Sequence, residues 1–295
     1  MKSYILNIAG YRIRFESADD GPDLVPSERF RKFLCKGHDT DFLIKIHSGK
    51  YDIPHKAEKV FNAPYVEEIS GIRIKKSNKF WSIYKNHHDL FIKTSSPLSP
   101  KKKKTVLKFS LRTREWEMWI EGKCRETDPM EYPADGLILY YISAIHGDIM
   151  IHASGINNAG KGYLFSGISG RGKTTMAKLW DKAGAYVIHD DRLIIRNTKD
   201  GFMMYNTPLY KNDSPRKSRL DRFFLIEHGK KNRIVPVKGA ECVSLILSNC
   251  IQHNWNAEII ENLLSSISVM SVSVPVAMLF FKPDRSVIDH ILENG

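Results

Sequence analysis

GISGRGKTT, residues 167–175, is the stretch that decides the fold of this chain. From Gly167 to Thr174 it fits the pattern G-x-x-x-x-G-K-[ST] of a phosphate-binding loop, or P-loop. Such a loop is expected between a strand and a helix. Here the apolar run KGYLF precedes it, and TTMAKLWDKAG follows with apolar residues at helical spacing. We therefore predict a strand, a P-loop and a helix in this order.

Each residue type in the stretch suits the binding of a triphosphate. Glycines allow positive φ and bring backbone N–H groups close to phosphate oxygens, and the helix N-terminus adds its partial positive charge. A lysine can reach the terminal phosphates, and a threonine hydroxyl can bind Mg²⁺. A glycine-rich turn that binds nothing is the alternative, which the flanking segments disfavour. The predicted nucleotide-binding residues are Gly167, Ser169, Gly170, Arg171, Gly172, Lys173, Thr174 and Thr175.

Two aspartates, Asp190 and Asp191, end the apolar segment AYVIHDD. This strand begins so soon after the P-loop helix that we expect it beside the P-loop strand. One carboxylate would then hold the metal, while the other accepts a proton from an incoming hydroxyl. The sequence does not assign the two roles. A surface turn or a helix cap is the alternative, which is disfavoured directly after an apolar strand.

His152 lies in IMIHASG, one strand before the P-loop strand. A lone histidine in such a strand is more often a satisfied core residue than a catalytic one. Position alone therefore favours a core role for His152, with a catalytic role as the alternative.

Together these segments resemble the C-terminal catalytic domain of the HPr kinase/phosphorylase family, through His152, Ser169 to Thr174, and Asp190-Asp191-Arg192. The SGxGKTT segment followed by two aspartates is also similar to ATP-dependent phosphoenolpyruvate carboxykinase, and both families share one type of P-loop fold. The resemblance implies an α/β P-loop kinase domain and phosphoryl transfer from a nucleotide to a serine hydroxyl. It also implies that His152 lies close to the catalytic aspartate.

The chain departs from that family at two places. Thr175 stands where the family has a glutamate, and TPLYKNDSPRKSRLDRFF occupies the region of its later glycine-rich signature. The chain looks more like divergent HPr-kinase-like proteins, some of which modify precursor peptides of natural-product clusters. In those proteins a C-terminal serine of the peptide can be the acceptor.

The chain divides into two predicted domains. Residues 1–130 repeat strand-like segments broken by turn residues, which indicates a β-rich meander. The basic surplus of the chain leans towards this part, which makes it a candidate surface for a substrate or partner. In EWEMWI (115–120) three apolar side chains share one face, so we expect a half-buried antiparallel strand. Residues 131–295 mix helical and strand patterns, so the predicted fold is an α/β P-loop kinase domain preceded by a β-rich domain.

The chain carries 45 Lys and Arg against 33 Asp and Glu, a net charge of +12 that suggests acidic partners. The run Lys101 to Lys104 fits a solvated loop better than a nucleic-acid contact. A nucleic-acid role rests on charge alone and ranks last. A second basic group can contact the transferred phosphoryl or an acidic acceptor, and a solvated loop is an equal alternative; its members are Arg216, Lys217, Arg219 and Arg222.

The sequence predicts neither a signal peptide nor a membrane span. The four cysteines are scattered without a CxxC pair, which favours reduced thiols in a cytoplasmic protein. The longest apolar runs, GLILYYISAI and VPVAMLFF, are about half the length of a membrane span. We therefore expect no membrane segment.

The sequence thus predicts a kinase that transfers the γ-phosphoryl of ATP to a hydroxyl of a peptide, protein or small molecule. The predicted catalytic residues are Asp190, Asp191, His152 and Lys173, and the predicted Mg²⁺ ligands are Thr174, Asp190 and Asp191. A nucleotide-sensing module without phosphotransfer and a carboxykinase-like enzyme are the alternatives. The acceptor and the oligomeric state, a homo-oligomer included, stay open.

Overall fold

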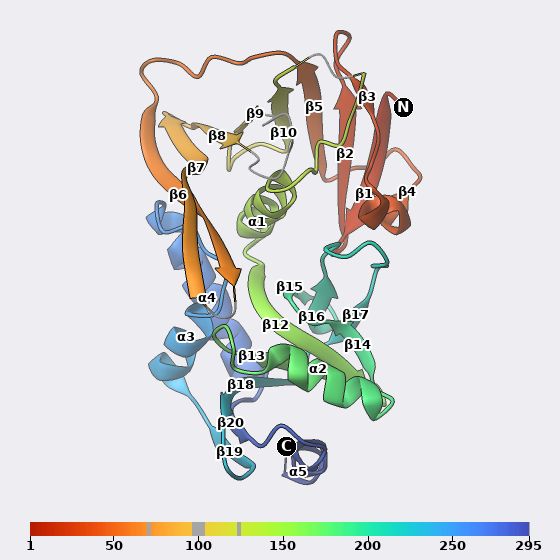
Figure 1. Cartoon of the computed structure of the whole chain (residues 1–295), viewed down its shortest axis with the longest axis vertical. Coiled ribbons are helices and arrows are strands. Elements are labelled where there is room, and N and C mark those ends of the chain that lie inside the picture. Colours follow the sequence, from red (N-terminus) through yellow and green to blue (C-terminus); the bar gives the residue numbers. More distant parts are fainter. Residues whose placement is uncertain (70–71, 96–103, 123–124, 295) are drawn as a thin grey trace. The chain divides into compact units, whose positions relative to one another are not determined.

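A computed structural model describes residues 1–69, 72–95, 104–122 and 125–294. The predicted loop at Lys101 to Lys104 falls outside these residues except for Lys104, which begins a strand. The chain divides into two compact units (Figure 1). The first comprises Met1–Tyr141 with Tyr210–Ser214, and the second comprises Ile142–Leu209 with Pro215–Gly295.

The first unit is built on a nine-stranded sheet in the order β4-β1-β2-β5-β10-β9-β8-β7-β6, beside a small β11-β3 pair. Its strands are β1 (Ser3–Ile8), β2 (Tyr11–Ser17), β3 (Asp23–Leu24), β4 (Leu34–Cys35), β5 (Phe42–Ser48), β6 (Glu58–Ile69), β7 (Ile72–Asn86), β8 (Asp89–Ser95), β9 (Lys104–Phe109), β10 (Glu115–Ile120) and β11 (Glu126–Thr127). The short helix η1 spans Glu28–Phe33, and helix α1 spans Ala134–His146, crossing from this unit into the second.

The sheet of the first unit is not a simple antiparallel meander. Trp116, Met118 and Ile120 of β10 are buried on one face, as their alternation predicts. However, β10 runs antiparallel only to β9 and parallel to β5, and β5 runs parallel to β2. The prediction of an antiparallel strand was therefore wrong on one side of β10. Alternation marks which face of a strand is buried, whereas direction depends on how the chain returns.

The second unit contains a mixed sheet in the order β17-β16-β15-β12-β13-β18-β20-β19, with β14 paired to β12. Its strands are β12 (Ile149–Asn158), β13 (Lys161–Ser166), β14 (Tyr186–His189), β15 (Arg192–Thr198), β16 (Gly201–Asn206), β17 (Lys217–Arg219), β18 (Arg222–His228), β19 (Arg233–Pro236) and β20 (Val276–Phe281). Its other helices are α2 (Lys173–Lys182), α3 (Gly239–Leu247), α4 (Ala257–Ser273) and α5 (Ser286–Asn294).

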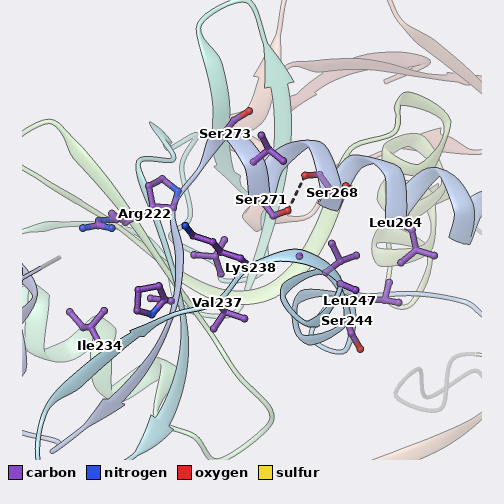
Figure 2. A pocket seen from close by; sticks show the side chains of 18 of the residues that line it. Arg222, Ile234, Val237, Lys238, Ser244, Leu247, Leu264, Ser268, Ser271 and Ser273 are labelled. Atoms are coloured by element: carbon purple, nitrogen blue, oxygen red, sulfur yellow. Dashed lines mark hydrogen bonds between the residues drawn. The ribbon is translucent and has the colours of Figure 1, made fainter.

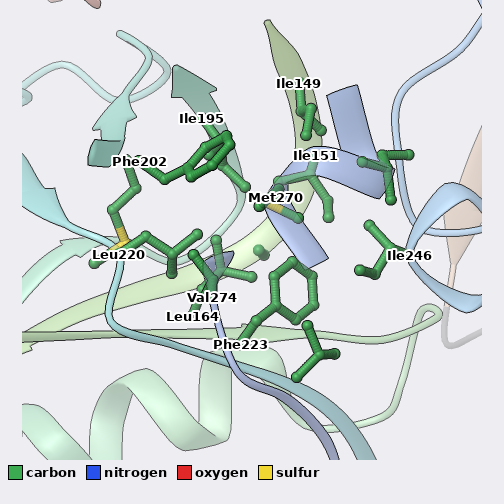
Figure 3. Packing of buried hydrophobic residues seen from close by; sticks show 14 of the residues in the cluster. Ile149, Ile151, Leu164, Ile195, Phe202, Leu220, Phe223, Ile246, Met270 and Val274 are labelled. Carbon is green, nitrogen blue, oxygen red and sulfur yellow. The ribbon is translucent and has the colours of Figure 1, made fainter. Parts of the chain in front are cut away.

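Two apolar clusters pack helices against this sheet. One joins α3 and α4 to strand residues such as Ile151, Leu164 and Phe223 (Figure 3). The other joins α2 and α5 to the alternate strand residues, among them Phe165 and Phe224. Because neighbouring residues of β13 and β18 belong to opposite clusters, the second unit is a three-layer α/β structure.

No helix within the described residues is long and apolar enough to cross a membrane. Cys35, Cys242 and Cys250 are free cysteines, and Cys124 lies outside the described residues.

The packing of α4 predicts different costs for two truncations on that helix. Ile267 is fully buried in the first cluster, whereas Val272 is 87% exposed. Ile267→Ala should lower the free energy of unfolding by about 2–5 kcal/mol, because it leaves a cavity in a packed core. Val272→Ala should change it by less than about 0.5 kcal/mol. Denaturant titration measures both, and equal losses would contradict the packing described.

Candidate functional site

The segment predicted as a P-loop, which keeps that name below, connects β13, which ends at Ser166, to α2, which begins at Lys173. Gly170 has φ +83° and Gly172 has φ +96°, both in the left-handed region that side chains disfavour. The backbone conformation therefore favours glycine at positions 170 and 172. Gly172 is also the N-cap of α2, so the loop leads directly into a helix N-terminus.

The ends of β18 and β20 support the loop from one side. A Cβ at Gly172 would lie 2.7 Å from the Cζ atom of Phe281, the last residue of β20. His228, the last residue of β18, stacks on the Phe281 ring with centroids 5.7 Å apart. Its Nε2 lies 3.0 Å from the carbonyl oxygen of Gly170. The loop is therefore held by both an apolar and a polar contact.

The cations of the loop have defined contacts. The Lys173 ammonium donates to the carbonyl oxygens of Gly167 at 2.6 Å and Ile168 at 3.3 Å, which keeps its charge inside the loop. Arg171 forms an ion pair with Glu227 at 3.0 Å. Thr174 and Thr175 are exposed in the first turn of α2, and Ser169 is exposed in the loop.

Two fully buried serines join β12 to both ends of the P-loop. Ser166 donates from its Oγ to the carbonyl oxygen of His152 at 2.7 Å. Ser154 donates from its Oγ to the carbonyl oxygen of Lys173 at 2.8 Å. A hydroxyl buried without a partner is costly, so these bonds fix where β12 lies against the loop.

Asp190 and Asp191 form a bend between β14 and β15. The prediction that their strand lies beside the P-loop strand was wrong. Both β14 and β15 pair with β12, whereas β13 lies between β12 and β18. The hairpin of β12 and β13 uses one edge of each strand, and the parallel strand β18 occupies the other edge of β13. The strands on either side of the aspartates, β14 and β15, therefore pair with the remaining edge of β12.

The bend nevertheless lies next to the same part of β12 that contacts the P-loop. Ala153 donates its backbone N–H to the carbonyl oxygen of Asp191 at 2.9 Å. His152 Nδ1 lies 3.4 Å from Asp191 Oδ1, and the two side chains are 55% and 41% exposed. His152 is thus not a core residue, contrary to the interpretation from position alone.

The environment of Asp191 favours its charged form. The hydrogen bond from His152 is the main cause that lowers the pKa of Asp191 below its ordinary value. The nearby charges of His152, Arg192 and His189 act in the same direction, while partial burial opposes them. The carboxylate is therefore ionised at neutral pH, as a metal ligand or a hydrogen-bond acceptor requires.

Arg192 entered the predicted site only through the family resemblance, and Thr207, His189 and the two buried serines were missed. Arg192 donates from Nε to the Thr207 hydroxyl at 3.0 Å, and that hydroxyl donates to the Arg192 carbonyl oxygen at 3.2 Å. His189 accepts bonds from the backbone of the aspartate bend. The available signal was a polar residue inside an apolar strand, as at Ser154, Ser166 and His189.

The second basic group is not gathered at the loop. Arg216 donates from Nη1 to the carbonyl oxygen of Val187, and Arg219 pairs with Asp221. Arg222 lines a separate groove of about 1370 Å³ that α3, α4 and the ends of β19 and β20 enclose (Figure 2). Among the described residues that line this groove, none belongs to the P-loop or the aspartate bend.

The chemistry of the donors fits Mg²⁺. A threonine hydroxyl and carboxylates are hard oxygen ligands, and in nucleotide sites Mg²⁺ is bound through one or two carboxylates plus substrate phosphates. Within the described ranges no three His, Cys, Asp or Glu side chains form a group that could hold a metal by themselves.

The loop geometry predicts that two glycines differ in their tolerance of alanine. Both Gly170→Ala and Gly172→Ala force a side chain into positive φ, which costs roughly 1–2 kcal/mol. Only Gly172→Ala also places a methyl against the Phe281 ring, while the position at Gly170 is open. Thermal unfolding should therefore show the larger loss for Gly172→Ala, and this excess should shrink in a Phe281→Leu background. Equal losses in the wild-type background would contradict the described contact.

The pair of His152 and Asp191 predicts a pH effect. Because the pKa of Asp191 is lowered in the folded state, its contribution to stability is present above the ordinary carboxyl pKa. That contribution is lost as pH falls through the lowered pKa. His152→Ala should raise the pKa of Asp191 towards its ordinary value, so the stability that depends on this ionisation becomes smaller than in the wild type. A carboxyl ¹³C NMR titration measures the shift, and an unchanged Asp191 pKa would refute the contact.

Comparisons with known proteins find similarity among solved structures and none among family models or curated proteins. No family model matches the chain, and none of the curated proteins compared with it matches. Among solved structures the chain is similar to the HPr(Ser) kinase/phosphatase from Coxiella burnetii, with 10% sequence identity and a TM-score of 0.30. The match covers 49% of this chain and 94% of that chain. This similarity is distant, so the proposals below are based on the chain's own residues.

Proposed function

We propose that this chain is a kinase that transfers the terminal phosphoryl group of ATP to a hydroxyl in a Mg²⁺-dependent reaction. One observation carries the proposal. Residues His152 to Ser154 of β12 are bonded to both ends of the P-loop and to the aspartate bend. A loop suited to phosphate and a carboxylate suited to metal or proton transfer are thus fixed to one rigid strand.

The loop would hold the triphosphate. Backbone N–H groups at the α2 N-terminus and the Lys173 ammonium provide positive charge where the phosphates would lie. Thr174 and one aspartate would hold Mg²⁺, which would supply charge neutralisation at the phosphates. Because phosphoryl transfer needs mainly positioning and charge stabilisation, a rigid loop of this kind is what the reaction requires.

The other aspartate would accept the proton of the acceptor hydroxyl. The hydroxyl oxygen forms a bond to the γ-phosphorus as the bond from that phosphorus to the β–γ bridging oxygen breaks, and ADP leaves. His152 would orient the Asp191 carboxylate through their contact. As the acceptor we propose a hydroxyl of a peptide, protein or small molecule, with a peptide serine preferred on the family resemblance.

The first test of this function is nucleotide binding. Lys173→Ala should weaken Mg-ATP binding roughly ten- to a hundredfold, because a hydrogen bond to a charged group contributes about 1.5–3 kcal/mol. Lys178→Ala, which removes an exposed lysine from the same helix, is the matched control and should leave binding unchanged. Isothermal titration calorimetry measures both. Unchanged affinity in the Lys173 variant would contradict a nucleotide at the P-loop.

The second test is transfer itself. The protein is incubated with Mg-ATP and sets of serine peptides and polyhydroxy compounds, and products are detected by mass spectrometry. Asp191→Asn should reduce transfer by about a hundredfold or more, whereas Asp181→Asn, at an exposed position of α2, should not.

The alternatives give different outcomes in the same assay. Tight Mg-ATP binding without any phosphorylated product would favour a nucleotide-sensing module over a kinase. Phosphate exchange that requires an organic acid instead of a hydroxyl would favour a carboxykinase-like enzyme.

A further inference from the structure

His189 is the last residue of β14 and directly precedes the aspartate bend. Its side chain is buried, with 4% of the residue exposed. Nδ1 of its ring accepts the backbone N–H of Asp191 at 3.1 Å and lies 3.4 Å from the backbone nitrogen of Arg192. Since both partners are backbone N–H groups, Nδ1 acts as the hydrogen-bond acceptor of this turn.

This geometry reproduces a well-known turn with an unusual side chain. In an Asx turn, an Asn or Asp oxygen accepts the backbone N–H two residues later and stabilises a bend. At His189 a ring nitrogen has the same role towards the residues at i+2 and i+3. The pairing of β12 with β14 also shifts register between Gly155 and Ile156, beside the Gly155–His189 pair. This shift lies before His189, and strand pairing resumes after the bend at His152 and Arg192, so the His189 side chain adds bonds within the bend itself.

Asp191 is consequently held by contacts at three of its groups. Its N–H bonds to His189, its carbonyl oxygen accepts from Ala153, and its carboxylate contacts His152. Of these contacts, the one from Ala153 fixes the bend to β12, and the one from His152 acts on the carboxylate alone. The contacts from His189 are the ones that reach the backbone N–H groups of the bend and of Arg192.

We propose that His189 is a positioning residue for the aspartate pair. Its Nδ1 sets the bend that directs Asp190 and Asp191 for phosphoryl transfer, an inference that rests on the proposed kinase function. Misplacement of a reacting group by about 1 Å can reduce a rate about a hundredfold. Loss of the bend should therefore act mainly on kcat, because the P-loop contacts that bind ATP do not involve His189.

Three variants test the acceptor rather than the bulk of the side chain. His189→Asn keeps an acceptor that can form an Asx turn, and His189→Leu keeps apolar volume without an acceptor. His189→Gln places its acceptor one bond further from the backbone. It replaces His189→Leu in the test if the leucine variant does not fold. We expect His189→Leu and His189→Gln to lower kcat about ten- to a hundredfold with KM for Mg-ATP changed less than about threefold. His189→Asn should keep kcat within about threefold of the wild type.

Backbone amide exchange, measured by NMR, provides a readout that needs no phosphotransfer. The amides of Asp191 and Arg192 should exchange faster in His189→Leu and His189→Gln than in the wild type, and His189→Asn should restore their protection. Unchanged exchange and kcat in His189→Leu would overturn the inference, as would a loss in His189→Asn equal to that in His189→Leu. If the wild type transfers phosphate to no acceptor, the proposed function fails, while the exchange data still decide the role of His189 in shaping the bend.

Discussion

The site depends on the hydrogen bonds that join residues 152–154 of β12 to the P-loop and to the aspartate bend. The Ser166 hydroxyl donates to the carbonyl oxygen of His152, and the Ser154 hydroxyl donates to the carbonyl oxygen of Lys173, so the strand is bonded to both ends of the P-loop. Ala153 donates its backbone N–H to the carbonyl oxygen of Asp191 in the aspartate bend. A shift of β12 by one residue would exchange the faces of every side chain in the strand. The register of this strand therefore sets the relation between the phosphate loop and the carboxylates.

Burial fixes that register. Ile149, Ile151 and Ala153 belong to the cluster that packs against α3 and α4, while Ile156 belongs to the cluster with α2. The alternation of a strand then places His152 and Ser154 on the α2 face. The contact between His152 and Asp191 is thus a consequence of core packing in the neighbouring positions, and that contact lowers the pKa of Asp191.

The local elements of this arrangement could be predicted from the sequence, whereas the pairing of its strands could not. The glycine spacing and apolar flanks gave the strand, loop and helix around residues 167–175, because those signals are contained in adjacent residues. The placement of Asp190 and Asp191 was predicted beside the wrong strand, since edge occupancy depends on β18, more than thirty residues later in the chain. The direction of β10 was missed for the same reason. The hydrogen bonds of the two serines and of His189 could not be predicted, because a polar residue in an apolar strand indicates that it has a partner but not which residue the partner is.

A structure of the protein with Mg²⁺ and a non-hydrolysable ATP analogue tests the central claim most directly. We predict that the terminal phosphate lies on the backbone N–H groups at the start of α2 and against the Lys173 ammonium, with the metal between the Thr174 hydroxyl and the aspartate bend. A nucleotide bound elsewhere, such as in the groove between α3 and α4, would contradict the account. A terminal phosphate at the P-loop with both Asp190 and Asp191 directed away from it would contradict it equally.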